Sequence, residues 1–405
     1  LFLKYMGPRK WIALIMVVWG TIMAVMATVK NGDGLLASRF FLGIAEAGLF
    51  PGVIFFLSVW YPRRTQTIRI ALFYAASTVA GAFGGVLAYG IMHMDGMRGL
   101  AGWQWIFIIE ALPTLILAFV TFFYLPDYPE NSPFLNNRER EIVVNRIKED
   151  AGPATETHFS WKQFFAAFLD LKVWLISIVS LCSCCPMYSL SLFMPTIVRD
   201  LGYTNLTAQA MSAIPYIFAC IATLTFAISS DRRAERGFHL AAVGLVGMVG
   251  YILLITLKDQ PAAGRFVAAT VASCGAFPLI PLISVWNANN NGGHTKRAVA
   301  IAIGAAVGNA GGIISGQMYR TDDAPHYIRG HTISCAMMAA NWIVALILRM
   351  YLSYENKKRD KLSPEQYRIA CEGEDLCDKV SYIKTIYIIF LCTRRLLLYF
   401  NAVSC

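Results

Sequence analysis

Residues 39–64 read RFFLGIAEAGLFPGVIFFLSVWYPRR, an apolar stretch long enough to cross a bilayer that nevertheless contains Arg39 and Glu46. A charged group at the centre of a membrane helix costs roughly 2.5–3.5 kcal/mol on insertion scales, so such groups usually mark functional positions. A separation of about two helical turns places both side chains on one face of a helix. This pattern predicts an anion site beside a proton-handling group. An intramembrane ion pair that only joins two helices is the alternative.

The composition is that of a membrane protein. Apolar residues make up 57% of the chain and charged residues 15%, whereas soluble globular domains have roughly 45–50% and about 25%. The net charge of +10 does not indicate nucleic-acid binding, because the basic residues form short clusters between apolar segments and no reader motif. Six of the ten cysteines lie within or beside apolar segments, where they behave as small hydrophobes. We therefore expect a protein that binds no metal or cofactor and is not an enzyme.

The number of membrane helices follows from segment length, because a span needs roughly 20 mostly apolar residues. We predict an all-α polytopic membrane protein with about ten transmembrane helices. The predicted spans are 11–29, 34–60, 68–93, 102–125, 173–197, 207–229, 239–257, 264–286, 298–319 and 331–352.

The loops alternate in basic charge, which predicts their sides of the membrane. The segments 1–10, 61–69, 230–239, 287–297 and 353–361 together contain 15 Lys and Arg residues. The alternating segments 30–33, 94–101, 198–206, 258–265 and 320–330 together contain 7. Because Lys and Arg accumulate on the cytoplasmic side, we expect both chain ends to be cytoplasmic.

The central connection, residues 126–172, divides the spans into two groups and is also expected to be cytoplasmic. We predict a partial N-terminal bundle of four spans in residues 1–125 and a C-terminal bundle of six spans in residues 173–352. Residues 353–405 form a cytoplasmic tail, whose sequence becomes aberrant after about residue 379.

Two basic loops form a weak internal repeat. Their residues of interest are Gly7, Arg9 and Lys10 in the first loop and Asp231, Arg232, Arg233, Arg236 and Gly237 in the second. Each loop resembles one copy of the Gly/Asp/Arg loop motif of the major facilitator superfamily. The resemblance gives these residues a role in gating.

Further segments resemble one branch of that superfamily, the fungal anion:cation symporters. They are residues 39–64, 286–300, 308–312 and 323–331. The allantoate-permease-like group of this branch, which includes nicotinate and other carboxylate carriers, is the most similar. The resemblance implies two six-helix bundles, so that two further helices would precede Gly7 and the chain would be a fragment.

The resemblance also implies a function: secondary active symport of a small organic anion with protons by alternating access. The proton gradient would supply the energy, with no cofactor. The protein would act as a monomer in the lipid bilayer of the fungal plasma membrane. Arg39 would hold the carboxylate of the substrate through two parallel charge-assisted hydrogen bonds. Glu46 would exchange the proton.

Four other polar residues are candidates. Glu110 is either a second proton-linked group or an acid that snorkels to the interface. We expect the substrate cavity to be lined by Tyr188, Asn309 and Gln317. The alternative is that these polar groups form hydrogen bonds between helices, each of which stabilises the membrane protein by about 0.6 kcal/mol on average. His331 is interpreted as a solvated loop histidine.

Two other functions stay open at this point. A nutrient sensor of the same fold would bind the ligand and signal without transport. A non-functional fragment would retain Arg39 and Glu46 as a structural pair. The substrate also stays open among small carboxylates such as allantoate, ureidosuccinate, nicotinate and pantothenate.

Overall fold

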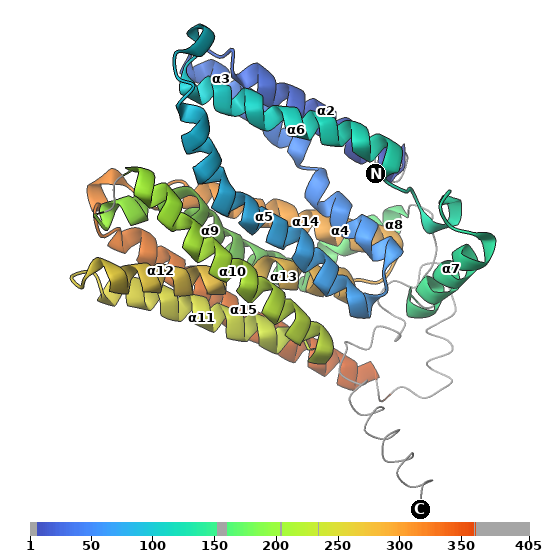
Figure 1. The fold of residues 1–405 in the computed structure, drawn as a ribbon. Coiled ribbons are helices and arrows are strands. Elements are labelled where there is room, and N and C mark those ends of the chain that lie inside the picture. The colour runs from blue at the N-terminus through green and yellow to red at the C-terminus, as the bar shows by residue number, and fades with distance from the viewer. Residues whose placement is uncertain (1–5, 152–159, 203–204, 234, 360, 362–405) are drawn as a thin grey trace, which may run out of the picture. The chain divides into compact units, whose positions relative to one another are not determined.

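In residues 6–151, 160–202, 205–233, 235–359 and 361, which the computed structural model describes, every regular element is a helix (Figure 1). Ten spans within this part are long and apolar enough to cross a membrane, which confirms the predicted all-α polytopic fold. The spans are Pro8–Met26, Gly32–Trp60, Ile68–Ala88, Gly102–Tyr124, Leu171–Asp200, Met211–Arg233, Gly237–Thr256, Ala262–Asn290, Thr295–Ser315 and Ile328–Lys358. The aberrant tail predicted after residue 379 lies outside the described residues.

The helices form two compact units. Unit 1 comprises Leu1–Pro62 and Ala82–Glu149, and unit 2 comprises Arg63–Gly81 and Asp150–Cys405. Helix α5 (Arg63–Met92) is continuous and contributes its first part to unit 2 and its second part to unit 1.

Unit 1 is built around α2, which packs along α6 and α3 (Figure 1). Besides the second part of α5, its helices are α2 (Pro8–Met26), α3 (Gly32–Glu46), α4 (Leu49–Trp60), α6 (Gly102–Tyr124) and α7 (Asn137–Ala151). The close approach of α2 and α6 depends on Gly20, since a Cβ there would lie 2.9 Å from Cδ2 of Leu115. Asn31 caps α3, because its side-chain oxygen accepts from the N–H of Gly34 at 2.9 Å.

The second span is interrupted by a proline and therefore consists of two helices, α3 and α4. Pro51 has no backbone N–H to donate to the carbonyl of Ala47, and its ring crowds that carbonyl. The chain consequently makes a turn at Ala47 and Gly48. Glu46 lies at the end of a helix inside a span rather than in the middle of a continuous one.

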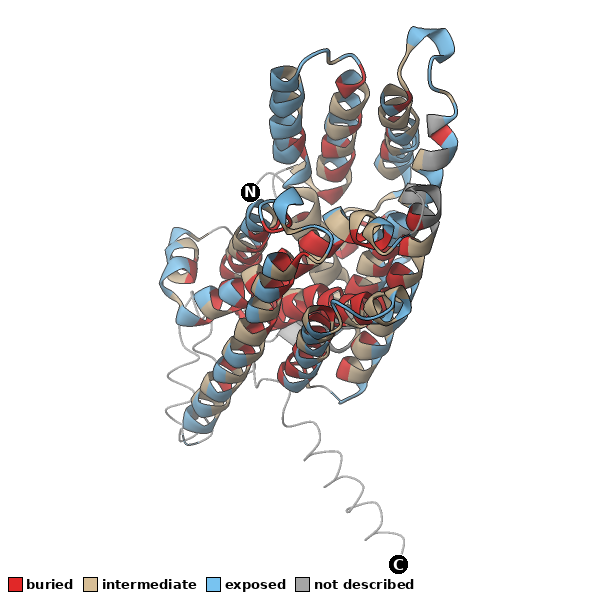
Figure 2. Ribbon diagram, turned by 90° about the vertical axis from the view of Figure 1, so that its left-hand side faces the viewer, coloured by how far each residue is buried: buried red, intermediate tan, exposed pale blue. Residues whose placement is uncertain are grey.

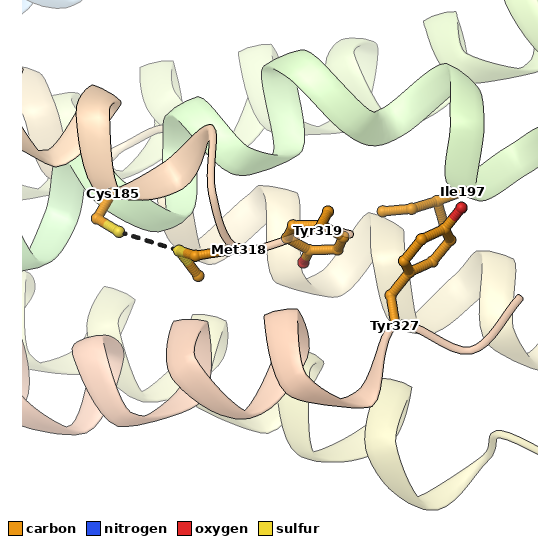
Figure 3. Close-up of a cluster of buried hydrophobic side chains, with 5 residues drawn as sticks. All are labelled: Cys185, Ile197, Met318, Tyr319 and Tyr327. Atoms are coloured by element: carbon orange, nitrogen blue, oxygen red, sulfur yellow. Dashed lines mark hydrogen bonds between the residues drawn. The ribbon is translucent and has the colours of Figure 1, made fainter. Parts of the chain in front are cut away.

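Unit 2 is organised around α9, which packs against α14, α15 and α10. Besides the first part of α5, its helices are α8 (Trp161–Leu169), α9 (Leu171–Asp200), α10 (Asn205–Arg233), α11 (Gly237–Thr256), α12 (Ala262–Ala276), α13 (Leu279–Asn290), α14 (His294–Ser315) and α15 (Ile328–Arg359). One buried cluster joins α9 to the segment between α14 and α15 (Figure 3). It consists of Cys185, Ile197, Met318, Tyr319 and Tyr327.

Glycines bring helices of unit 2 into backbone contact. A Cβ at Gly275 of α12 would overlap the backbone N and Cα of Gly247 on α11, and a Cβ at Gly250 would overlap the backbone of Ala272. In lipid, small residues allow this close packing, which supplies van der Waals contact where the hydrophobic effect cannot drive association.

Many large apolar residues are exposed. Along the helices, exposed and buried stretches of the ribbon lie on different sides (Figure 2). On α6, for example, Ile116 and Phe119 are 63% and 68% exposed. Such a surface suits lipid tails and would be unusual on a soluble monomer.

The span Ala262–Asn290 also consists of two helices, since α12 ends at Ala276 and α13 begins at Leu279, beside Pro278 and Pro281. The span predicted to end at residue 319 is too long, since α14 ends at Ser315.

Candidate functional site

Arg39 projects from α3 toward α6 and is exposed within unit 1. Its guanidinium carbon lies 5.7 Å from the centre of the Phe107 ring on α6. A guanidinium over an aromatic face is stabilised electrostatically, yet its N–H groups stay available for other partners. Phe107 therefore orients Arg39 without neutralising its charge.

Glu46 follows two turns later on the same helix and is also exposed. It is close enough to Arg39 for an electrostatic interaction between the two charges. No ion pair joins them in the described part of the chain. The arrangement thus differs from the hydrogen-bonded pair that a purely structural role favours.

The third acid of unit 1, Glu110, lies on α6 three residues after Phe107, which puts the two side chains on one helix face. Glu110 is exposed. Its backbone carbonyl accepts a hydrogen bond from the Thr114 hydroxyl. Arg39 and Glu46 share helix α3, whereas Glu110 lies on α6.

In unit 2 the structure joins two of the predicted cavity residues directly. The hydroxyl of Tyr188 on α9 donates to Oδ1 of Asn309 on α14 at 2.8 Å. Gly312 makes room for the tyrosine, since a Cβ there would lie 3.4 Å from the Tyr188 ring.

Gln317 and His331 lie in surroundings that were not predicted. Gln317 is exposed in the turn after α14, so it is not a residue of the span. His331 is not the solvated residue that its sequence position predicts, because it is 3% exposed and its Nδ1 lies 3.0 Å from the Tyr319 hydroxyl. The prediction was wrong because α15 begins at Ile328, which places His331 inside the packed first turn of the span.

The loop of Gly7 is attached to the segment that follows α6. Gly7 has a φ of 82°, and a Cβ there would lie 2.7 Å from Oδ1 of Asp127. The N–H of Arg9 donates to the same oxygen at 3.1 Å, and the Arg9 side chain donates to the carbonyl of Phe122. Lys10 is exposed.

The equivalent loop of unit 2 contains a buried ion pair. Nη2 of Arg236 lies 3.5 Å from Oδ1 of Asp231, and both side chains are buried. Asp231 also accepts from the backbone N–H of Ile68 on α5 at 3.1 Å. By contrast, Arg232 and Arg233 are exposed at the end of α10. Gly237 starts α11.

Gly237 leaves space for an arginine of α15. A Cβ at Gly237 would lie 3.0 Å from Cγ of Arg349. The Arg349 guanidinium lies over the Phe238 ring, 3.5 Å from its centre, and Nε lies 3.3 Å from Oε1 of Glu235. This second charged contact ties the loop to α15.

Sequence reasoning missed two partners of these loops, Asp127 and Asn289. The amide oxygen of Asn289, oriented by its hydrogen bonds, accepts from Nη2 of Arg236 at 3.2 Å. The sequence does contain a pattern at each position. Asp127 is an acid between two prolines directly after a span, and Asn289 belongs to a run of asparagines at the end of a span.

Comparison with known proteins places these features in a family. The family model described as the Major Facilitator Superfamily matches residues 1–316. The MFS transporter prlL of Fungal sp. (strain NRRL 50135) is 35% identical over 358 residues, which are 88% of this chain and 72% of that protein. A protein of Agrobacterium vitis named "Putative tartrate transporter" is 32% identical over 381 residues, 91% of this chain and 83% of that protein.

Solved structures agree at the level of the fold. The proton:xylose symporter XylE superimposes with a TM-score of 0.65 at 15% identity, covering 86% of this chain and 81% of that chain. At this identity the likeness concerns the fold alone. With the family match and the similar curated proteins, it leads to one conclusion: the chain belongs to the Major Facilitator Superfamily and is a membrane transporter.

Proposed function

We propose that this transporter moves a small organic anion together with protons, as a member of the fungal anion:cation symporter branch. The observation that carries the proposal is the arrangement on α3. Arg39 and Glu46 lie two turns apart within one membrane span, are exposed, and are not joined by an ion pair in the described residues.

Arg39 is the substrate-binding residue of this proposal. A guanidinium in a membrane span is costly unless a partner or water compensates its charge. Phe107 contacts only the face of the guanidinium, so the planar fork of N–H donors remains suited to a carboxylate. The Agrobacterium vitis relative is named for tartrate, a small dicarboxylate, which agrees with this choice of substrate class.

Glu46 is the proton carrier of this proposal. Its position at the end of α3, beside the interruption caused by Pro51, resembles the discontinuous helices at which transporters place their ion sites. A proton on Glu46 removes the negative charge next to Arg39, so proton and anion favour each other's binding. This reciprocal linkage is what symport requires.

The remaining polar candidates take supporting roles in the proposal. Glu110 is a second proton-linked group on α6. Tyr188 and Asn309 are proposed substrate contacts, and the hydrogen bond between them supports this pairing. Gln317 is left out of the site, because it is exposed in the turn after α14. The gradient of protons supplies the energy.

Uptake measurements test the proposal. The protein, reconstituted in liposomes, should accumulate a labelled carboxylate such as nicotinate, allantoate or tartrate when the outside is acidic. Accumulation should stop when an uncoupler dissipates the gradient. Uptake that requires ATP and ignores the proton gradient would contradict the symport mechanism.

The orientation in the membrane is a separate prediction, since we also propose a plasma-membrane protein with both chain ends cytoplasmic. Single cysteines at Asp259 and Asp322, both exposed, should react with an impermeant thiol reagent on intact cells. A cysteine at the exposed Arg232 should react only after the membrane is opened. Labelling of position 232 in intact cells would reverse the orientation.

A further inference from the structure

The short helix α8 has an exposed aromatic face. Trp161, Phe165, Phe168 and Leu169 are 62%, 59%, 42% and 87% exposed. At about 100° per residue, these positions fall in one continuous arc of the helix surface. Trp161 stacks on Phe165, with ring centres 6.1 Å apart, so the face is a contiguous aromatic surface.

The opposite face of α8 holds the beginning of α14. Gln163 is 4% exposed, and its Oε1 accepts from the backbone N–H of Thr295 at 3.1 Å. Gly293 just before α14 leaves room for this oxygen, since a Cβ there would lie 2.6 Å from it. In addition, the backbone N–H of Ser160 donates to the Thr295 hydroxyl at 3.2 Å. The glutamine therefore satisfies a free N–H group at a helix start, as a capping residue does.

Contacts with α9 fix the direction of α8. The indole N–H of Trp174 donates to the carbonyl of Phe168 at 2.8 Å. Asp170, which separates the two helices, caps α9 by accepting from the N–H of Lys172 at 2.9 Å. Asp170 also binds Nζ of Lys296 on α14 at 2.6 Å. The helix α8 is thus attached to α9 and α14 at the residues where both enter the membrane.

We propose that α8 is an interfacial helix, which lies in the surface of the bilayer with its aromatic face among the lipids and fixes the start of α14 there. The position supports the bilayer as the occupant, because membrane spans begin immediately beside α8. The aromatic face continues into exposed apolar residues of α9, Leu171 and Trp174, which belong to a span. Aromatic residues prefer this depth of the membrane, and in-plane helices present such a face to it.

Spin labels test this placement in the full-length protein in liposomes. Single cysteines at Phe165 and Leu169, in a background without other cysteines, would carry the nitroxide. Ile178 on α9, 41% exposed in a membrane span, is the lipid-facing control. Asp259, in an exposed loop, is the water-facing control.

The collision rates of the labels with oxygen and with a water-soluble nickel complex distinguish the possible surroundings. We expect the oxygen-to-nickel ratio at positions 165 and 169 to be severalfold higher than at 259 and to approach that at 178. A ratio like that at 259 would mean that the face is in water. Shielding from both reagents would mean that a second copy or another protein covers it. Either result would overturn the proposal.

A second measurement avoids replacing the native cysteines. Lipids brominated near the headgroup quench only tryptophans at the membrane surface. The unaltered protein should show more quenching than a Trp161→Phe variant, and the difference should shrink when the bromine is moved to the end of the acyl chain. Equal quenching of the two proteins by the headgroup-brominated lipid would contradict an interfacial α8.

Discussion

A Glu46→Gln variant should lose proton-driven accumulation of substrate while still binding and exchanging it. Glutamine retains the shape and hydrogen-bonding capacity of a protonated glutamate, but it cannot release a proton. The coupling would therefore disappear and the binding site would persist. Counterflow of labelled substrate in liposomes, compared with uptake driven by a pH gradient, measures the two activities separately. The same change at the exposed Glu141 of α7 is the matched control and should leave both unaffected.

The companion change, Arg39→Lys, should weaken substrate binding about 10- to 100-fold. This range follows from the roughly 1.5–3 kcal/mol of a hydrogen bond to a charged group. Lysine keeps the charge but cannot form the two parallel bonds of a guanidinium. Binding measured by isothermal titration, with Arg98→Lys in an exposed loop as control, gives the difference.

A double variant separates the functional from the structural interpretation of this pair. If Arg39 and Glu46 only stabilised the fold, replacing them by Met and Gln would be neutral or stabilising, because both desolvation penalties disappear. We expect instead a folded protein without transport. Proton-coupled uptake by Arg39→Met/Glu46→Gln would contradict both assigned roles and would leave the family assignment intact.

A Gly275→Ala variant should be severely destabilised, by at least the ~1–3 kcal/mol that overpacking costs in well-packed interiors. The added Cβ would meet the backbone of Gly247 on α11, and backbone atoms cannot rotate away as a side chain can. The helices α11 and α12 would have to separate. Thermal unfolding of the purified protein in detergent, followed by size-exclusion chromatography, measures the effect.

The matched control for this change lies on the same helix. Gly264 is in the first turn of α12, and the nearest atom to a Cβ there is Cδ1 of Leu257 at 3.9 Å. Gly264→Ala should therefore leave the unfolding temperature unchanged or raise it, since alanine favours helix more than glycine does. If both variants unfolded at the same temperature, the contact between α11 and α12 would not be tight.

The spans could be predicted from sequence because their length and apolarity are imposed by the bilayer itself. Proline alone did not predict the interruptions, because Pro51 follows a break in its span whereas Pro186 and Pro195 lie inside the continuous helix α9. The location of Arg39 and Glu46 on a single helix followed from their spacing, and α3 contains both.

Side-chain partners could not be predicted in the same way, because they depend on which helices become neighbours. The hydrogen bond between Tyr319 and His331 joins a loop to the start of a span, and neither residue reveals this locally. Asn289 meets Arg236 across 53 residues of chain only because α13 ends beside the start of α11. Hydropathy also extended the ninth span past Ser315, because Met318 and Tyr319 are apolar enough to continue it.

The proline in the second span has a consequence for water. Pro51 cannot supply the N–H that would normally bond to the carbonyl of Ala47, so that oxygen needs another donor. Within hydrocarbon, a polar backbone group without a donor costs several kcal/mol and is tolerated only where protein or a water-filled cavity surrounds it. Water that hydrates this carbonyl would stand directly beside Glu46, the last residue of α3. The interruption would then provide a proton with an aqueous route to the acid.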